Sequence, residues 1–479
     1  MNEISEKTIL NDIINNLALM MRTAQMHNIN NTAVINQIER VVLLVNSVLS
    51  EAGILRIDLV GEFIHINNER VRYPLEHLFN VDSLIKELKK RGVGTIIFEN
   101  KLEMEEVKVF VKSFISAGSS DNPFEAIYSA VSGLRSIEID RLKSVKEQDR
   151  DIRKIVKKSY FKAVAFSKGE INVNKVKAKD AVSVKKTKMI IRSLVDMILE
   201  EEQLLLGMTA IKDYDEYTYH HSVNVSVLSL ALGQRLGFDK KALTELGIAA
   251  LFHDVGKVTV PPEILNKPAS FSDEEWTIIR KHPVWGFKTE LKMKTIDPII
   301  IRAAIVSFEH HLNYDYTGYP KLRIAAGLDT FSRIVSIADQ YDALTSSRVY
   351  RRTALSPDRA LSILIEDSGK KVDPFLLKIF VNMVGVFPIG TLVMLNTQEL
   401  GIVCESNPLF VDRPKVRVIA NKNDIRSDYI VDLSEKMPDG RFARSIGKTL
   451  DCNKYKINLA EYLFTAPVQT PPQNITISM

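Results

Sequence analysis

The chain has 479 residues, of which 45% are hydrophobic and 26% charged, with a formal net charge of +5. Domains average about 100 to 200 residues, so we expect three folded units. This composition is typical of a globular protein and excludes a fibrous or wholly disordered chain. The only cysteines, Cys404 and Cys452, are too few for a disulfide framework or a thiolate metal cage.

The positive charge is concentrated in one segment. Residues 141–188 hold sixteen Lys and Arg against five Asp and Glu, which leaves the rest of the chain about six charges negative. A basic run can bind nucleic acid or an anionic membrane, but a solvated linker or helix face is the commoner explanation and the one we favour. No aromatic platform is interleaved with it, so we expect no nucleic-acid partner.

The first part of the chain predicts a small α+β module over residues 1–118. Helical periodicity runs from residue 5 to residue 52 with a break near Asn28, and strand-like and helical segments then alternate. The expected later elements are strands at 55–60, 63–71 (turning at Asn67–Asn68) and 94–98, and helices through Leu84 and over 104–114. No motif in this module identifies an input signal, which leaves homodimerisation or contact with a signalling protein partner as its roles.

Membrane insertion is not expected. The best apolar stretch, residues 41–49, is interrupted by Asn46 and Ser47 and falls short of the ~20 residues that span a bilayer. The acids Glu3 and Glu6 do not suit a signal peptide, so we expect no transmembrane segment and a cytoplasmic location.

The remainder of the chain divides by its pattern into four segments. Residues 119–209 form a basic linker with a lead-in helix, and residues 210–385 repeat helical spacing almost without strand-like alternation. The third segment, 386–465, is predicted to be a small β-rich module, with strands at 391–395, 400–404, 415–419 and 429–433. The proline-containing tail, 466–479, is predicted to be disordered. The predicted fold class is therefore multidomain, with an all-α domain between an α+β and a β module.

Six of the nine histidines lie between residues 220 and 311, inside the predicted all-α domain. The segment LTELGIAALFHDVGK brings His253 and Asp254 to the end of an apolar helix. Burying a carboxylate there is costly unless a metal ion or hydrogen bonds compensate, and its two oxygens allow it to bridge two ions. The dipeptide alone remains weak support for a metal site.

A wider set of motifs resembles the HD-GYP family of the HD superfamily of phosphohydrolases. The motifs are YTYHHSVNVS, LFHDVGKVTVP, the stretch from ILNKP to KHPVWG, FEHHLNYDYTGYP and RIVSIADQYDALTSSRVYRR. They occur in the family's order across most of residues 210–385, so the resemblance implies a metal-dependent helical phosphohydrolase domain acting on cyclic di-GMP.

The resemblance also implies roles for individual residues. The family's metal ligands fall on His221, His253, Asp254, His282, His310, His311 and Asp339. Its catalytic residues fall on Asp254 and Lys257, and its substrate-contacting residues on Lys257, Gly318, Tyr319, Pro320, Arg348 and Arg351. For the two arginines a surface helix face remains the alternative role.

Imidazole and carboxylate ligands without thiolates suit first-row divalent ions, and the resemblance favours two ions of iron or manganese. Two such ions can polarise a phosphodiester oxygen and lower the pKa of a bridging water. Asp342 is a candidate to orient one of the imidazoles from outside the ligand set, with a helix-surface role as the alternative.

Three departures from the family pattern bear on function. Leu312 replaces a common Glu, Tyr316 replaces a common Gly, and Tyr217 stands where three-metal members have Glu, so we expect two ions. The principal hypothesis is a phosphodiesterase that opens cyclic di-GMP to pGpG, with further cleavage to GMP left open. The alternatives are a catalytically weak nucleotide-binding signalling adaptor and a phosphodiesterase for another cyclic dinucleotide.

Overall fold

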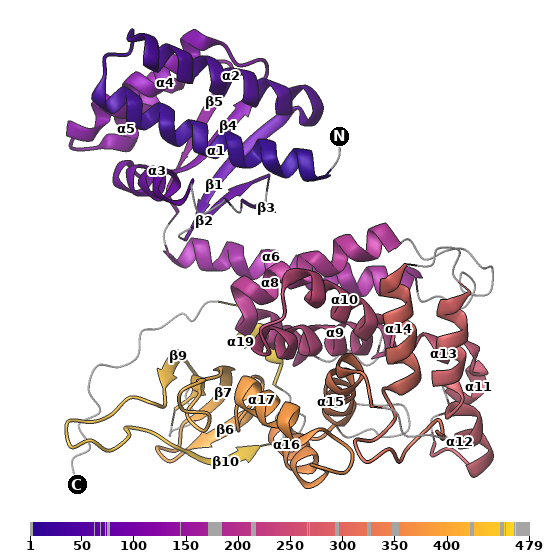
Figure 1. Ribbon diagram of the computed structural model, residues 1–479. Coiled ribbons are helices and arrows are strands. Elements are labelled where there is room, and N and C mark those ends of the chain that lie inside the picture. The colour runs from indigo at the N-terminus through magenta and orange to yellow at the C-terminus, as the bar shows by residue number, and fades with distance from the viewer. Residues whose placement is uncertain are drawn as a thin grey trace. The chain divides into compact units, whose positions relative to one another are not determined.

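The computed structural model divides into two compact units, Met1–Ile152 and Arg153–Met479, which are described separately (Figure 1). It describes residues 3–61, 63–67, 69–71, 73, 77–143, 145–170, 184–211, 217–265, 267, 269–292, 297–322, 327–346, 354–421, 426–450, 455, 457–463 and 465.

The first unit is a five-stranded antiparallel sheet packed against helices, with strand order β3-β2-β1-β4-β5. Its elements are α1 (Glu3–Met26), α2 (Thr32–Ala52), β1 (Ile54–Val60), β2 (Phe63–Ile66), β3 (Glu69–Arg70), α3 (Leu78–Arg91), β4 (Val93–Glu99), α4 (Met104–Ser116), η2 (Ala117–Ser119), α5 (Pro123–Val131) and β5 (Ile137–Arg141). Alternate residues of β1, such as Leu55, Ile57 and Leu59, are buried, and they share one hydrophobic core with the helices.

This unit extends past residue 118, the boundary predicted from the sequence. The strand β5 pairs with β4, with Ile139 opposite Ile96, so residues 119–141 complete the sheet instead of forming a linker. The helix α5 packs beside α4 and places Ile127 in the same core.

Among the described residues one helix, α2, is long and apolar enough by length and composition to cross a membrane. The sequence predicted no such segment. The buried side chains of α2 recur every three or four residues, at Val34, Ile38, Val41, Val45 and Leu49, and lie in the core of the first unit. That one-sided pattern is typical of a helix packed against a protein core.

The described part of the second unit is helical up to residue 384. The sequence predicts this for residues 210–385, whereas the long helix over residues 145–170 stands where a basic linker was predicted. Its helices are α6 (Val145–Glu170, which begins before the division at residue 153), α8 (Val184–Thr209), α9 (Tyr217–Arg235), α10 (Lys240–Phe252), η3 (Val255–Thr259), α11 (Pro262–Leu265), α12 (Asp273–Ile279), α13 (His282–Leu291), α14 (Pro298–Glu309), α15 (Thr330–Thr345), α16 (Pro357–Glu366) and α17 (Pro374–Val384).

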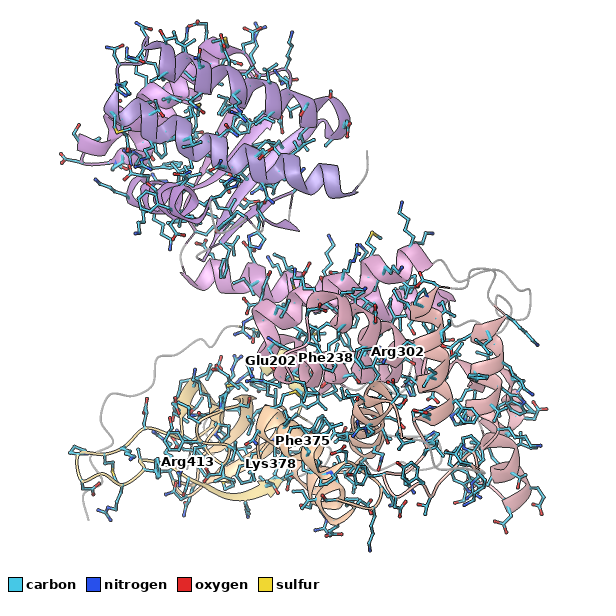
Figure 2. All side chains as sticks on the ribbon, viewed as in Figure 1. Glu202, Phe238, Arg302, Phe375, Lys378 and Arg413 are labelled. Carbon is cyan, nitrogen blue, oxygen red and sulfur yellow. The ribbon has the colours of Figure 1, made fainter. Side chains whose placement is uncertain are left out.

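The centre of this helical domain is α9, whose residues 220–233 are all buried. A helix buried on every side must be surrounded, and α9 packs against α8, α10, α15 and α17. Two side chains labelled in Figure 2, Phe238 and Arg302, both contact the ring of Phe331, which anchors the start of α15. These contacts join the start of α15 to α14 and to the chain that follows α9.

A second antiparallel sheet follows, with order β10-β6-β7-β8-β9. Its elements are β6 (Leu392–Leu395), β7 (Leu400–Glu405), β8 (Lys415–Ala420), β9 (Arg426–Asp432) and β10 (Ile446–Leu450), followed by α19 (Leu459–Leu463). Four of the strands are those predicted from the sequence, and β10 is an addition. The predicted tail, 466–479, lies outside the described residues.

Candidate metal centre

The seven predicted ligands converge at one place in the helical domain, although they span 119 positions of the chain. Each lies on α9, α13 or α15, or where α10 or α14 ends, and these helices are packed together. The ligands form two groups whose donor atoms lie within 4.8 Å of one another: Asp254, His282, His310 and His311 in one, and His221, His253 and Asp339 in the other.

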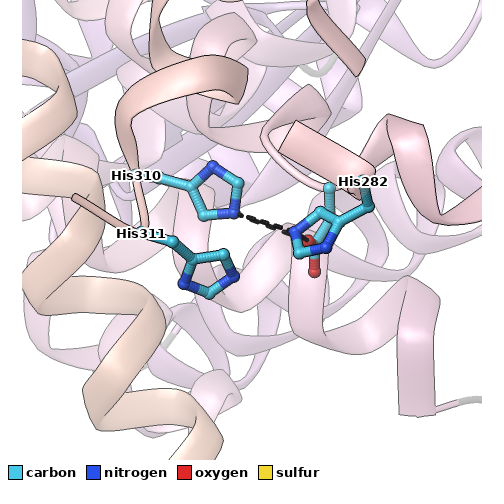
Figure 3. Close-up of side chains that lie close together, drawn as sticks. His282, His310 and His311 are labelled. Atoms are coloured by element: carbon cyan, nitrogen blue, oxygen red, sulfur yellow. Dashed lines mark hydrogen bonds and ion pairs between the residues drawn. The ribbon is translucent and has the colours of Figure 1, made fainter. Parts of the chain in front are cut away.

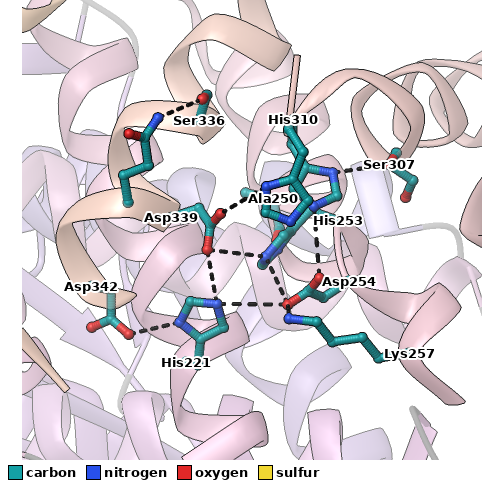
Figure 4. A network of polar contacts seen from close by, with 12 residues as sticks. His221, Ala250, His253, Asp254, Lys257, Ser307, His310, Ser336, Asp339 and Asp342 are labelled. Atoms are coloured by element: carbon teal, nitrogen blue, oxygen red, sulfur yellow. Dashed lines mark hydrogen bonds and ion pairs between the residues drawn. The ribbon is translucent and has the colours of Figure 1, made fainter. Parts of the chain in front are cut away.

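Asp254 lies between the two groups and directs one oxygen to each (Figure 4). Its Oδ1 is 3.2 Å from His282 Nε2 and 3.7 Å from His310 Nε2. Its Oδ2 is 3.3 Å from His253 Nε2 and 3.7 Å from His221 Nε2. This is the arrangement that a bridging carboxylate needs.

Asp339 completes the second group and also approaches the first. Its Oδ1 is 3.1 Å from His221 Nε2 and 3.9 Å from His253 Nε2, while its Oδ2 is 3.9 Å from His311 Nδ1. The two carboxylates therefore place negative charge on either side of the imidazoles.

Local hydrogen bonds orient three of the imidazoles. His253 Nδ1 is 2.7 Å from the Ala250 carbonyl oxygen, one helical turn earlier, and can only donate to it. The corresponding distances are 2.7 Å from His282 Nδ1 to the Ile279 oxygen and 2.9 Å from His310 Nδ1 to the Ser307 oxygen. With Nδ1 protonated, the neutral ring presents the Nε2 lone pair to the cluster. Figure 3 shows His282 and His310 facing each other beside His311.

Burial and charge set the protonation states. Burial lowers the pKa of His282 to about 4 and that of His311 well below its usual range, so both rings are neutral ligands at pH 7. Burial would raise the pKa of Asp254, but Lys257 and His253 outweigh it and hold the value well below normal. Hydrogen bonding to His221 likewise outweighs burial at Asp339. Both carboxylates are therefore ionised.

The donor set fits divalent cations. His253 is fully buried and Asp254 is 4% exposed. Neither His253 Nε2 nor Asp254 Oδ1 has a hydrogen-bond partner of standard geometry among the described residues. Buried polar atoms without such partners are costly, and cations placed between the two groups would satisfy them. Imidazole and carboxylate donors without sulfur suit first-row divalent ions.

Lys257, on η3, lies at the edge of the cluster. Its ammonium group donates a short hydrogen bond to Asp254 Oδ2, and its side chain is 22% exposed, so it is reachable from solvent. It is thus positioned to place a positive charge beside any phosphoryl group that reaches the cluster.

The turn formed by Gly318, Tyr319 and Pro320 packs directly against the ligands. Tyr319 stacks on His311, with ring centroids 4.6 Å apart and an interplanar angle of 33°. Gly318 has φ +91°, and a Cβ there would lie 2.3 Å from the His311 carbonyl oxygen, so only glycine fits. The peptide between Tyr319 and Pro320 is cis.

Of the remaining predicted residues, Arg348 and Arg351 lie outside the described residues. Leu312 is 3% exposed and packs into the domain. Tyr316 is 42% exposed and holds φ +64°, a conformation that the family's glycine adopts without strain.

The sequence left the role of Asp342 open, and the structure places it beside a ligand. Asp342 is 1% exposed, and its Oδ2 lies 2.8 Å from His221 Nδ1. It thus orients His221 as main-chain carbonyls orient His253, His282 and His310.

Comparison with known proteins agrees with this geometry. Residues 192–376 match the family model described as HD domain. A cyclic di-GMP phosphodiesterase of Pseudomonas aeruginosa is 35% identical over 221 residues, which cover 46% of this chain and 52% of that protein. A cyclic di-GMP phosphodiesterase of Borreliella burgdorferi is 28% identical over 46% of this chain and 55% of that protein.

A third relative, a 3'3'-cGAMP-specific phosphodiesterase of Vibrio cholerae, is 33% identical over 33% of this chain and 33% of its own length. The chain thus spans about half the length of the first two relatives. The matched region contains all seven residues of the two His/Asp groups. Residues 192–376 are therefore similar to the HD domain family, and the His/Asp cluster lies within them.

Proposed function

We propose that this chain is a metal-dependent phosphodiesterase that hydrolyses cyclic di-GMP to pGpG, with GMP as a further product. The observation that carries the proposal is Asp254, whose two oxygens each face one of the two ligand groups. The names of two relatives that share the domain support cyclic di-GMP as the substrate.

One ion would be held by Asp254, His282, His310 and His311. The other would be held by His221, His253 and Asp339 together with the second oxygen of Asp254. Iron or manganese bound in this way would supply a water of lowered pKa and an electrophilic pull on the phosphodiester. The neutral state of His282 and His311 and the ionised state of the two aspartates favour binding at pH 7.

Other side chains of the protein would contact the substrate or position the ligands. Lys257 would exchange its contact with Asp254 for the phosphoryl oxygens, because a carboxylate that binds cations needs no ammonium partner. Tyr319 holds His311 in place, and Gly318 leaves room for the turn to pass close to it. Contacts from Pro320, Arg348 and Arg351 to substrate remain predictions.

A phosphodiesterase for a different cyclic dinucleotide is the second candidate, and it rests on the cGAMP-specific relative. Cyclic di-GMP, cyclic GMP-AMP and cyclic di-AMP should be offered separately to the same metal-loaded preparation, with products resolved by chromatography. We expect the highest kcat/KM with cyclic di-GMP. A higher value for cyclic GMP-AMP would reassign the substrate, and full metal occupancy without any product would favour the signalling adaptor.

A further inference from the structure

A line of buried hydrogen bonds leads from α6 to one of the metal-binding histidines. Tyr160, on α6, is fully buried, and its hydroxyl donates to Asn224 Oδ1 at 2.7 Å. Asn224 Nδ2 donates to Asp342 Oδ1 at 2.9 Å. Asp342 Oδ2 in turn lies 2.8 Å from Nδ1 of His221. Tyr160 lies outside the region that matches the HD model, which begins at residue 192.

In each hydrogen bond of this line, the bond before it decides which group donates and which accepts. Burial raises the pKa of Tyr160, so its hydroxyl stays protonated and can donate to the amide oxygen. With its oxygen engaged, Asn224 turns its NH₂ group toward Asp342. Asp342 is then the acceptor, and Nδ1 of His221 must carry the proton that it accepts. Nε2 of His221 is left on the side of Asp339 and the ligand cluster, where its lone pair would bind a cation.

His221 differs in this respect from His253, His282 and His310. Those three rings donate to carbonyl oxygens three residues earlier in the chain, so the main chain next to each ligand orients it. The described partner of His221 Nδ1 is instead a side chain of α15, which is itself held from α9 and α6. A change at Tyr160 can therefore reach His221 without altering the backbone that carries it.

A second contact keeps the Tyr160 hydroxyl in place. His220 Nδ1 lies 3.3 Å from Tyr160 Oη, where it can donate to the phenolic oxygen while the Tyr160 hydroxyl still donates to Asn224 Oδ1. Ser346 adds a hydrogen bond to Asp342 Oδ2 at 3.2 Å, on the side of His221. Tyr160 thus fixes the amide orientation, and Asn224 transmits that orientation to Asp342.

We propose that Tyr160 is a positioning residue for the metal centre, acting through Asn224 and Asp342 to fix the tautomer and orientation of His221. The inference rests on the proposed function only in requiring that the cluster binds divalent ions. Loss of a hydrogen-bonding partner outside the ligand set typically weakens metal binding about 10- to 100-fold, and a group two links away should act at the low end.

The test is the equilibrium affinity of the full-length chain for Mn(II), measured by competition with a chelator, together with urea unfolding. Tyr160→Phe should weaken the binding of one ion about tenfold. The matched control is Tyr429→Phe, which also removes a buried hydroxyl, one that donates to Glu399 in the β module. The control should lose stability to a similar extent and keep the wild-type affinity.

Asn224→Ala tests the same line of hydrogen bonds independently, even if Tyr160→Phe folds poorly. Where both single variants fold, the double variant Tyr160→Phe/Asn224→Ala extends the test. If both residues act through one line, the double variant binds Mn(II) no more weakly than Asn224→Ala alone, whereas independent effects would multiply. Unchanged affinity in Tyr160→Phe, an equal loss in Tyr429→Phe, or multiplying losses would each overturn the inference. Absence of Mn(II) binding by the wild-type chain would instead refute the proposed function.

Discussion

Lys257 and Asp254 form a charge pair in which the two partners have different expected roles. Asp254 faces both ligand groups, whereas the Lys257 ammonium group pairs with the Asp254 carboxylate and is partly exposed. Lys257→Met should therefore leave the metal-to-protein ratio near that of the wild type and lower kcat about 100-fold, as expected for loss of a charged group beside the reacting phosphate.

Lys267→Met is the matched control, because Lys267 is also paired with a carboxylate, that of Glu275, outside the ligand cluster. Metal content and turnover are measured on the same samples. Parallel loss of metal and rate in Lys257→Met would show that Lys257 supports the ligands and not the substrate.

Glu290, on α13, is a buried carboxyl that the sequence does not single out. It is 1% exposed, and neither of its oxygens has a hydrogen-bond partner of standard geometry among the described residues. Burial raises its pKa well above the usual value, and Ser307 offsets this only in part. The folded state thus holds the proton more tightly than the unfolded state, so stability falls as pH rises from about 4.3 through the raised pKa.

Glu290→Gln removes the ionisation and should stabilise the fold by about 1 to 2 kcal/mol at pH 8, with little difference from the wild type at pH 4. Urea unfolding at both pH values measures the effect. Glu366→Gln, at an exposed position on α16, should change neither value. A stability difference that does not grow with pH would contradict the assignment of a buried, protonated Glu290.

At the scale of elements, the close packing of η3 on α13 holds Asp254 and His282 together. A Cβ on Gly256 would lie 2.0 Å from the His282 carbonyl oxygen and 2.5 Å from the Gly286 nitrogen. Gly256→Ala must push the two elements apart, and we expect a destabilisation of about 3 kcal/mol with loss of metal binding.

Gly327→Ala serves as the control, because nothing lies within 4 Å of a Cβ at Gly327. Thermal unfolding and metal content are the readouts for both variants. Wild-type metal content in Gly256→Ala would contradict the view that this contact sets the spacing between the two ligand-bearing segments.

The helices, and which His and Asp residues come together, were predictable from sequence because their signals are local. The seven ligands stand in contiguous motifs, and the helices around them repeat apolar residues over many turns. The strands β5 and β10 were missed because each has only five residues. The alternation of β5 covers only residues 137–140, and β10 has no regular alternation. Tyr160 could not have been predicted, since its contact with Asn224 joins residues 64 positions apart.

On the scale of the whole molecule, the region that matches the HD model holds both His/Asp groups, and we assign no role to the other parts. The first unit contributes no residue to the two His/Asp groups, which lie within residues 221–339. A homodimer, a signalling partner for the flanking modules and a cytoplasmic location stay predictions, as does the absence of nucleic-acid binding.

The most direct measurement takes the full-length chain, loaded anaerobically with Fe(II) or Mn(II), and determines the metal-to-protein ratio and cyclic di-GMP cleavage on the same sample. We predict about two ions per chain, one for each ligand group, and release of pGpG or GMP. The double variant His253→Ala/Asp254→Ala should remain folded, lose metal and form no product. Turnover by that variant at the wild-type rate would contradict the assignment of hydrolysis to this cluster, and a wild-type chain that binds no metal would contradict the metal centre itself.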